Sequence, residues 1–374
     1  MMKYVFRLLL PVTLLLLLSG CWSYSELNER TIIAGAAVDL TESGEILLTA
    51  ETVEFSEGDS PSVKAEILTG KGRSIAEAVY DIMNQSGKEL YWYQATLLVI
   101  DNKYAEKGIR ELLDYILNVN EMRLTLKLAV SRLETAAEVF ELECHGSNIK
   151  SFAIDSIIKE QSGLGKTVSS DAYYIINRML EPGAEFALSQ ILSDVSQKSA
   201  TVDIAGCGVF KDDKLAGWLD DEETVFVQLL SGNVQKAEFD FILEGSRVAV
   251  NASDWKIKTR PTIAGGKAET DVEINAEYEI LVIDGDLDVN ETADTEKISA
   301  ALGRFVESHL KDMVEHLQAL SCDALGWGNL VWQSNPEGYN GLASWYDIFS
   351  DMDTRLTMKF NNNNNLAGNR VRLS

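Results

Sequence analysis

Hydrophobic and polar residues recur with the periods of strands and helices in the first part of the chain. Residues 31–38 and 45–55 are rich in β-branched and other apolar residues, and the Glu-Ser-Gly sequence at 42–44 suits a turn. We therefore predict a β-hairpin. Ser74 and Glu77 then have the spacing of a capping box, followed by apolar residues on one helical face, which predicts a helix start.

Strand and helix patterns continue to alternate through the middle of the chain. The periodicity predicts a strand over residues 95–100, a helix over 104–117 and a strand over 124–130. Residues 144–199 have a mainly helical pattern, which a Ser-Gly-Leu-Gly and a Pro-Gly sequence interrupt.

The C-terminal part of the chain contains the longest amphipathic pattern. Residues 206–219 predict a hairpin, while residues 273–283 and 353–360 alternate as half-buried strands do. An apolar stripe marks a helix over residues 294–320. We expect this helix to pack across a sheet that contains both strands, burying Leu302, Phe305, Met313 and Leu317 and exposing Glu307, Lys311, Asp312 and Glu315. Gly217→Val in the hairpin should damage packing, because glycine permits close backbone approach there.

These elements predict an α+β fold of several small mixed-sheet domains, with helices packed on the sheets. With 374 residues and 46% hydrophobic content, the chain is long enough for more than one core. We place the main boundary near residues 198–202. It separates an N-terminal α+β region, residues 21–200, from a C-terminal α+β domain, residues 201–374. The N-terminal region could consist of two subdomains.

The first 20 residues have the pattern of a bacterial lipoprotein signal peptide. Lys3 and Arg7 precede an uncharged run, residues 8–18. The length of this run suits a signal peptide and is too short to span a bilayer core of about 30 Å. A lipobox-like sequence follows, formed by Leu18, Ser19, Gly20 and Cys21. We expect removal of residues 1–20 and a diacylglyceryl group on Cys21, whose two acyl chains hold a protein stably on a membrane.

The charge balance excludes some classes of partner. The chain has 33 Lys and Arg against 58 Asp and Glu, a net charge of -25. Loss of residues 1–20 removes two bases and no acid, which leaves 31 against 58, or -27. Nucleic acid and a bare anionic lipid surface are poor partners, because binding to them rests on Lys and Arg that neutralise phosphate. The folded part should stand off from anionic lipid.

The remaining cysteines suggest neither a metal cage nor a disulfide framework. Cys144, Cys207 and Cys322 are widely spaced and form no CxxC sequence. At most one disulfide can form among them, and their apolar surroundings favour buried free thiols.

Two motifs resemble ligand sites but lack essential parts. Gly-Lys-Thr at 165–167 looks like the end of a phosphate loop, yet Glu160 stands where that loop needs glycine and the preceding residues predict a helix. Acidic residues alternate over 284–290 as in a calcium loop, but Val289 and Thr295 replace its glycine and its bidentate glutamate. We expect a solvated acidic loop, with no metal or cofactor.

The sequence also lacks a recognisable combination of catalytic residues. The three histidines are His145, His309 and His316, and the last two are seven residues apart on one helix, too far for a metal pair. No GxSxG sequence occurs. Aromatic clusters at 91–93 and 327–345 are compatible with a sugar platform, but we favour rings that fill a core. The sequence therefore predicts a protein that is not an enzyme.

Five blocks in order resemble the Ger(x)C family of spore germination lipoproteins. The first four are CWSYSELNERTIIAGAAVDL from Cys21, GKGRSIAEAV from Gly70, LLVIDNKYAEKGI from Leu97 and GCGVFKDDKLAGWLDDEET from Gly206. The fifth is the ordered set Gln318, Asp323, Gly326, Gly328, Pro336 and Trp345. The resemblance covers nearly the whole chain. Two departures are Gln94, where the family often has His, and the asparagine run at 361–365.

The resemblance implies the C subunit of a nutrient germinant receptor in an endospore-forming bacterium. Such a subunit has small α+β domains without a known catalytic site. It is lipid-anchored on the outer face of the cell membrane or inner spore membrane, beside integral membrane subunits A and B. The resemblance leaves open which nutrient acts as germinant and whether this subunit binds it directly.

A solute-binding lipoprotein of a transporter is the alternative from another class, since such proteins also begin with a lipobox and are often acidic. They usually have two larger α/β lobes around a ligand cleft, and the sequence contains no such doubled pattern. An envelope hydrolase is a third option.

Overall fold

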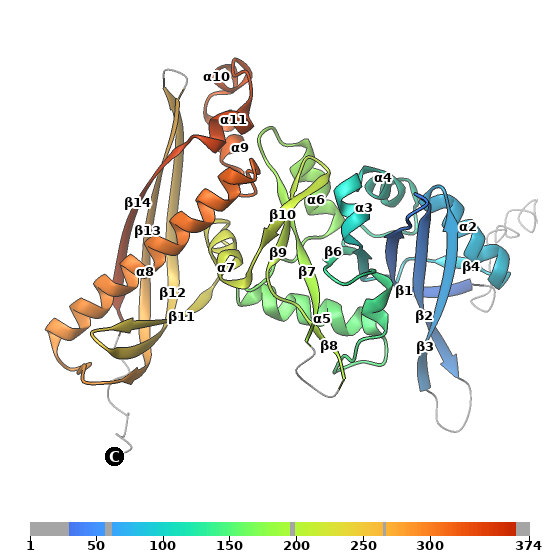
Figure 1. Cartoon of the computed structure of the whole chain (residues 1–374), viewed down its shortest axis with the longest axis horizontal. Helices are drawn as coiled ribbons and strands as arrows, with labels where there is room; N and C mark the ends of the chain where they lie inside the picture. The colour runs from blue at the N-terminus through green and yellow to red at the C-terminus, as the bar shows by residue number, and fades with distance from the viewer. Residues whose placement is uncertain (1–29, 57–61, 195–198, 265–266, 364–374) are drawn as a thin grey trace, which may run out of the picture.

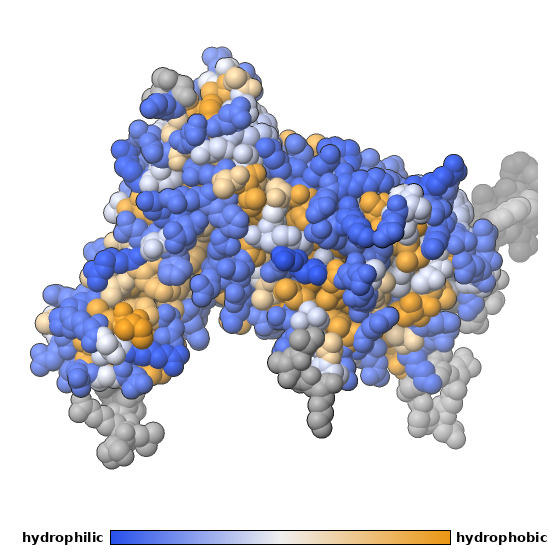
Figure 2. Space-filling view, in the orientation of Figure 1, coloured by the Kyte–Doolittle hydropathy of each residue, from blue (hydrophilic) through white to orange (hydrophobic). Residues whose placement is uncertain are grey.

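The computed structural model describes residues 30–56, 62–194, 199–264 and 267–363. These residues form an α+β fold with two mixed sheets, so the expected fold class is confirmed (Figure 1). None of their helices is long and apolar enough to cross a membrane. Figure 2 shows a mainly hydrophilic face interrupted by small hydrophobic areas.

The first sheet contains the strands up to residue 219. Its order is β10-β9-β7-β6-β5-β1-β2-β3, with β4 beside β1 and β8 beside β7. The expected first hairpin is present, because β1 and β2 pair antiparallel, whereas β1 and β5 pair parallel. The strands are β1 (Arg30–Leu40), β2 (Ile46–Ser56), β3 (Ser62–Gly72), β4 (Glu89–Tyr91), β5 (Leu97–Ile100), β6 (Lys127–Ser131), β7 (Phe186–Asp194), β8 (Thr201–Asp203), β9 (Cys207–Lys211) and β10 (Lys214–Leu219).

Helices cover both faces of the first sheet. Residues of α2, α3, α4 and α6 share an apolar cluster with one face, and residues of α5 and η2 share another with the opposite face. Central strands such as β5 are therefore buried along their whole length. The helices are α2 (Ile75–Ser86), α3 (Asn102–Lys107), α4 (Arg110–Asn118), the 3-10 helix η2 (Ala137–Phe140), α5 (Lys150–Gly163) and α6 (Ala172–Leu180).

The second sheet has the order β11-β12-β13-β14, and β14 runs parallel to β13. The expected long helix, α8, packs on its inner face, where the Tyr278 hydroxyl on β13 lies 2.8 Å from the Ser299 hydroxyl on α8. The elements of this part are α7 (Asp221–Leu230), β11 (Lys236–Leu243), β12 (Ser246–Ala264), β13 (Lys267–Asp284), α8 (Thr292–Ala319), α9 (Trp327–Ser334), α10 (Pro336–Asn340), α11 (Trp345–Ser350) and β14 (Asp353–Asn362).

One residue of the expected α8 core is placed differently. Leu302, Met313 and Leu317 are fully buried, but Phe305 is only half-buried. Its ring centre lies 5.9 Å from that of Phe239 and 5.8 Å from that of Phe241. Both partners belong to β11, the edge strand, which leaves part of the ring uncovered. The four polar residues expected on the outer face, Glu307, Lys311, Asp312 and Glu315, are exposed.

The single helix expected over residues 104–117 is two helices, α3 and α4. Gly108 separates them with φ +122°, a conformation that residues with side chains rarely adopt. The N–H of Ile109 donates to the carbonyl oxygen of Asp213, 2.8 Å away in the β9–β10 turn. This long-range bond breaks the helix, and the local periodicity did not reveal it.

The helical prediction for residues 144–199 is wrong over its last part. Helices α5 and α6 are present and end near the predicted breaks, but Phe186–Asp194 forms strand β7. The first six residues of β7 are buried, because it lies in the middle of a sheet covered on both faces. Such a strand has a continuous apolar run, which periodicity cannot distinguish from a buried helix.

The hairpin at 206–219 forms as predicted, and it lies in the first sheet although we grouped it with the C-terminal domain. Strand β9 pairs with β10 and also with β7, so the hairpin extends the first sheet. The rings of Phe186 and Phe210 stack there at 4.9 Å. The boundary near residues 198–202 and the division into two subdomains stay predictions.

Candidate functional site

The lipidation site expected from the sequence is outside the described residues. Leu18, Ser19, Gly20 and Cys21 precede Arg30, where β1 begins. Lipidation at Cys21 therefore stays a prediction.

The two motifs that resemble ligand sites belong to connections between elements. The segment 165–167 follows helix α5, and the hydroxyl of Thr167 donates to the carbonyl oxygen of Gly206 at 2.7 Å. In the acidic loop, the N–H of Asp288 donates to the Asp294 carboxylate at 3.0 Å. Among the described residues, no group of three His, Cys, Asp or Glu is placed to hold a metal ion.

The histidines of α8 make packing contacts. Nδ1 of His316 lies 2.6 Å from Oε1 of Glu223 in α7, and Nδ1 of His309 lies 2.7 Å from the carbonyl oxygen of Phe305. Cys144, Cys207 and Cys322 are all free thiols; Cys207 and Cys322 are buried as expected, whereas Cys144 is half-buried. Burial raises the pKa of each of the three thiols, so none is activated as a thiolate.

The aromatic clusters are occupied by contacts within the protein. In the first, the Arg30 guanidinium lies 5.2 Å from the ring centre of Tyr91, and the Arg123 guanidinium lies 4.8 Å from that of Tyr93. In the second, Trp327 and Trp345 are buried, which agrees with rings that fill a core.

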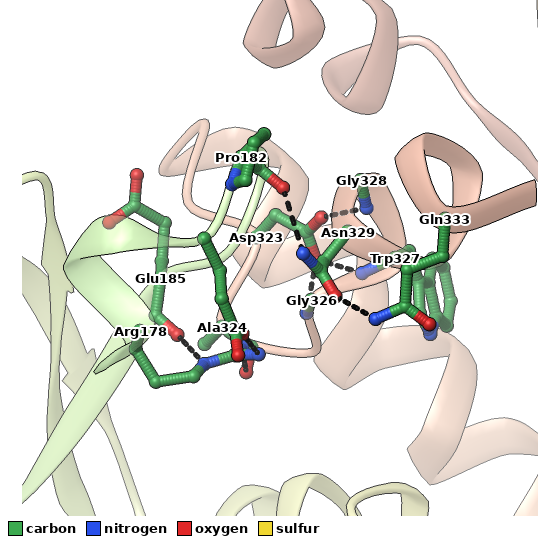
Figure 3. A network of polar contacts seen from close by, with 11 residues as sticks. Arg178, Pro182, Glu185, Asp323, Ala324, Gly326, Trp327, Gly328, Asn329 and Gln333 are labelled. Carbon is green, nitrogen blue, oxygen red and sulfur yellow. Dashed lines mark hydrogen bonds and ion pairs between the residues drawn. The ribbon is translucent and has the colours of Figure 1, made fainter. Parts of the chain in front are cut away.

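A set of polar side chains joins the two sheets, and we call it the junction cluster. Two of its members, Arg178 in α6 and Glu185 before β7, belong to the first sheet and its helices (Figure 3). Asp323 follows α8, and the remaining two residues lie in α11. The cluster consists of Arg178, Glu185, Asp323, Trp345 and Tyr346.

Asp323 is fully buried and accepts hydrogen bonds from four donors. Burial raises the pKa of its carboxyl group, while the hydrogen bonds act in the opposite direction. Three donors are backbone N–H groups at the start of α9, where a carboxylate is favoured. The four donors are the N–H of Gly326 (2.8 Å), Trp327 (3.1 Å) and Gly328 (2.7 Å) and the indole N–H of Trp345 (2.9 Å).

Glu185 connects three segments of the chain. Its carboxylate accepts from the N–H of Asp212, 2.7 Å away in the β9–β10 turn, and from the hydroxyl of Tyr346. Its own N–H donates to the carbonyl oxygen of Asp323 at 3.2 Å. Burial raises the pKa of Glu185 to about 7, although both hydrogen bonds to the carboxylate lower it. Glu185 therefore changes charge close to neutral pH.

Arg178 links the same segments through their carbonyl groups. Its Nε donates to the carbonyl oxygen of Glu185 at 2.8 Å, and its Nη2 donates to that of Ala324 at 3.2 Å (Figure 3). Nη1 also lies 3.5 Å from a carboxylate oxygen of Glu181. One guanidinium thus holds the start of β7 against the loop that precedes α9.

Two glycines allow the backbones to meet at the junction. The N–H of Asn329 donates to the carbonyl oxygen of Gly183 at 3.0 Å. A Cβ atom on Gly328 would lie 2.5 Å from Nε1 of Trp345 and 2.7 Å from the carbonyl oxygen of Gly183. No side chain fits there, so the close contact between α9 and the α6–β7 connection requires glycine.

The arrangement holds two parts of the molecule together through hydrogen bonds within the protein. None of the buried side-chain nitrogen and oxygen atoms of the junction cluster lacks a hydrogen-bond partner. An active site, by contrast, keeps a nucleophile, base or acid available to a substrate. The cluster is therefore built as a rigid joint with one proton-binding group.

Part of this joint is recognisable in the sequence. Asp323 and Trp345 stand in the fifth block that resembles the family, and so does Gln318, whose Nε2 donates to the carbonyl oxygens of Phe349 and Met352 at 3.0 and 2.7 Å. Arg178 and Glu185 were missed. The Pro-Gly sequence between them predicts only a turn, and their partners on the far side of the junction, Asp323, Ala324 and Tyr346, lie more than 130 residues away.

The comparisons with known proteins agree over both halves of the chain. Residues 23–192 match the spore germination protein N-terminal domain, and residues 205–364 match the C-terminal domain described as spore germination B3/GerAC like. The chain belongs to the Ger(x)C family of spore germination proteins.

Relatives resemble this Ger(x)C protein along almost their full length. Spore germination protein KC of Bacillus subtilis (strain 168) is 21% identical, and the match covers 91% of each chain. Spore germination protein B3 of the same organism is 21% identical over 93% of this chain and 94% of its own. GerQC of Bacillus cereus is 18% identical over 96% and 97%.

A solved structure shares the fold. The crystal structure of the GerBC protein superimposes with a TM-score of 0.57 at 17% identity and covers 88% of this chain and 96% of its own. The likeness therefore includes both sheets.

Proposed function

We propose that this Ger(x)C protein is the C subunit of a nutrient germinant receptor. In this role it is a non-enzymatic lipoprotein on the outer face of the cell membrane or inner spore membrane, where it assists integral membrane subunits A and B during spore germination. Family membership over both halves and the lipobox-like sequence that ends at Cys21 support the proposal.

The observation that supports the structural part of this role is the junction cluster. Its buried carboxylates accept hydrogen bonds from backbone and side-chain donors of the protein, such as Gly328 N–H and the Tyr346 hydroxyl. Such a joint holds the parts of the molecule that carry the two sheets in a fixed relation. A scaffold that positions membrane subunits needs this property, and we infer that the subunit acts through its shape.

Replacing Cys21 tests the anchoring and the role together. In Cys21→Ala, the diacylglyceryl group has no thiol to receive it, so the protein should leave the membrane fraction and nutrient germination should fall strongly. Cys144→Ala is the matched control, since it removes a half-buried thiol far along the chain and should change neither result. Full membrane attachment with full germination in Cys21→Ala would refute the proposal.

The alternative of a solute-binding lipoprotein finds no support in the comparisons. Thermal shift of the protein with amino acids and sugars separates the two roles. A subunit that acts as a scaffold should show no change in melting temperature, whereas a ligand that binds the folded state stabilises it by mass action.

A further inference from the structure

Strand β3 is an open edge of the first sheet. Among the residues that the structure describes, it pairs only with β2, through eleven consecutive residue pairs without a bulge, and it contains no proline. Residues 63–67 are all exposed, including Val63 at 40% and Ile67 at 45%. Figure 1 shows β2 and β3 at the end of the molecule remote from the second sheet. There they extend beyond the other strands of the first sheet. Long, flat edges of this kind template strand pairing unless charge or a bulge blocks them.

The direction of the free amides follows from one hydrogen bond. The N–H of Lys71 donates to the carboxylate of Asp81 in α2 at 2.9 Å, so it points away from β2. In an antiparallel pair, alternate residues direct their N–H and C=O groups to the same side. The backbone groups of Val63, Ala65 and Ile67 therefore point to the open edge.

The side chains along this edge are complementary to themselves. If two copies of β3 run antiparallel with Ala65 opposite the partner's Ala65, Lys64 lies opposite the partner's Glu66. Val63 then lies opposite the partner's Ile67. Symmetry repeats each match, which gives two charge pairs and two apolar pairs across the axis. The charges that would protect an edge from other strands thus favour this one register.

We propose that β3 pairs with β3 of a second copy of this chain about a two-fold axis at Ala65, joining two first sheets into one continuous sheet. Five residues from each copy form the contact. A standard interface of about 1,600 Å² contains roughly 20–30 residues on each side, so this contact buries much less area. The association is therefore weak and concentration-dependent. It does not rest on the germinant-receptor role, and either can fail alone.

Disulfide trapping in the full-length chain tests the register. Residues opposite each other in a hydrogen-bonded antiparallel pair have Cα atoms about 5.5 Å apart, within the range of a disulfide. Ala65→Cys should therefore give at least about fivefold more cross-linked homodimer than Thr69→Cys, whose two copies would lie roughly 26 Å apart in this register. Thr69 is on the same edge and equally exposed, which makes it the matched control. The parent chain gives the background from Cys144.

Charge reversal in the Ala65→Cys background tests the pairing itself. Lys64→Glu and Glu66→Lys should each lower the cross-linked yield about tenfold, since like charges then face each other twice. The combined K64E and E66K change should restore the yield, whereas Lys71→Glu, outside the paired residues, should leave it unchanged. Circular dichroism of each variant verifies the fold. Equal yields at 65 and 69, a higher yield from Ile67→Cys, no rescue by the double change, or cross-linking to a different protein would each overturn the proposal.

Discussion

Glu185 and Asp323 are both buried at the junction, where Asp323 accepts mainly from nearby backbone N–H groups and Glu185 accepts from Asp212 and the distant Tyr346. Asp323 has four donors for its two oxygens, and Glu185 has two. A buried carboxylate is tolerated only when such donors replace water. The two residues should therefore respond differently to loss of charge.

Asp323→Asn should destabilise the protein by about 2–4 kcal/mol. The amide NH2 group of asparagine would face the donors of Gly328 and Trp345, so two buried donors lose their acceptor. The measurement is urea unfolding followed by circular dichroism. Asp312→Asn, at an exposed position on α8, is the control and should change the free energy of unfolding by less than about 0.5 kcal/mol. Equal effects at both positions would contradict the role assigned to Asp323.

Glu185 should make stability depend on pH near neutrality. The pKa of Glu185 is raised to about 7 in the folded protein from an ordinary value of 4.5, so the folded state binds more protons between these pH values. The contribution from protonated Glu185 is complete below pH 4.5 and is lost as pH rises through 7. It amounts to about 3 kcal/mol at most.

Glu185→Gln isolates this contribution, because the amide resembles the protonated acid and does not titrate. The parent chain loses stability as the pH rises, so the difference in free energy of unfolding between Glu185→Gln and the parent should shift in favour of the variant by about 2 kcal/mol from pH 5 to pH 8. Urea unfolding at several pH values measures the difference. Glu222→Gln, at an exposed position, is the control. Parallel stability curves for the parent and Glu185→Gln would show that Glu185 does not titrate in this range.

Among the elements, predictability follows from how each one is buried. Helix α8 has one face on the second sheet and one in solvent, so its apolar stripe was visible in the sequence. Strand β7 is buried on both faces and strand β3 is largely exposed, so neither alternates clearly, and both were missed. The split between α3 and α4 depends on Asp213, a residue about 100 positions away, which no local pattern includes.

Close packing between elements predicts a contrast between two glycines. A Cβ atom on Gly328 would meet the ring of Trp345 and a backbone oxygen, whereas one on Gly217 would meet only the end of the Leu320 side chain. Gly328→Ala should therefore cost about 2–3 kcal/mol, and Gly217→Ala about 1 kcal/mol or less, because a flexible side chain can move. Gly217→Val should lie between them. Thermal melts rank the variants, and the reverse order would refute this account of the junction.

Phe305 packs against the edge strand β11 and is only half-buried, so replacing its ring should reduce the free energy of unfolding by less than the loss of a fully buried ring. Phe305→Ala should destabilise by about 2–3 kcal/mol, below the 3–5 kcal/mol of a fully buried ring. Glu307→Lys, on the exposed face of α8, should stay within about 0.5 kcal/mol. If urea melts found Phe305→Ala silent and Glu307→Lys strongly destabilising, the orientation of α8 would be wrong.

At the scale of the whole molecule, segments that flank the first and second sheets meet at the junction cluster. The sequence predicted the α+β class and the elements with a clear local periodicity, such as α8, and the family resemblance marked Asp323 and Trp345. It could not pair Arg178 and Glu185 with the loop after α8, because that contact exists only once both sheets have formed. A joint of this kind suits the proposed role as a scaffold, and the net charge of -25 disfavours contact between the folded part and anionic lipid.

Co-purification from spore membranes tests the central claim most directly. The tagged full-length chain, solubilised in mild detergent, should recover integral membrane subunits of the A and B type, and Cys21→Ala should recover much less of both. Recovery of a transporter permease in their place, or of no membrane protein from the parent chain, would contradict the assignment as a germinant-receptor C subunit.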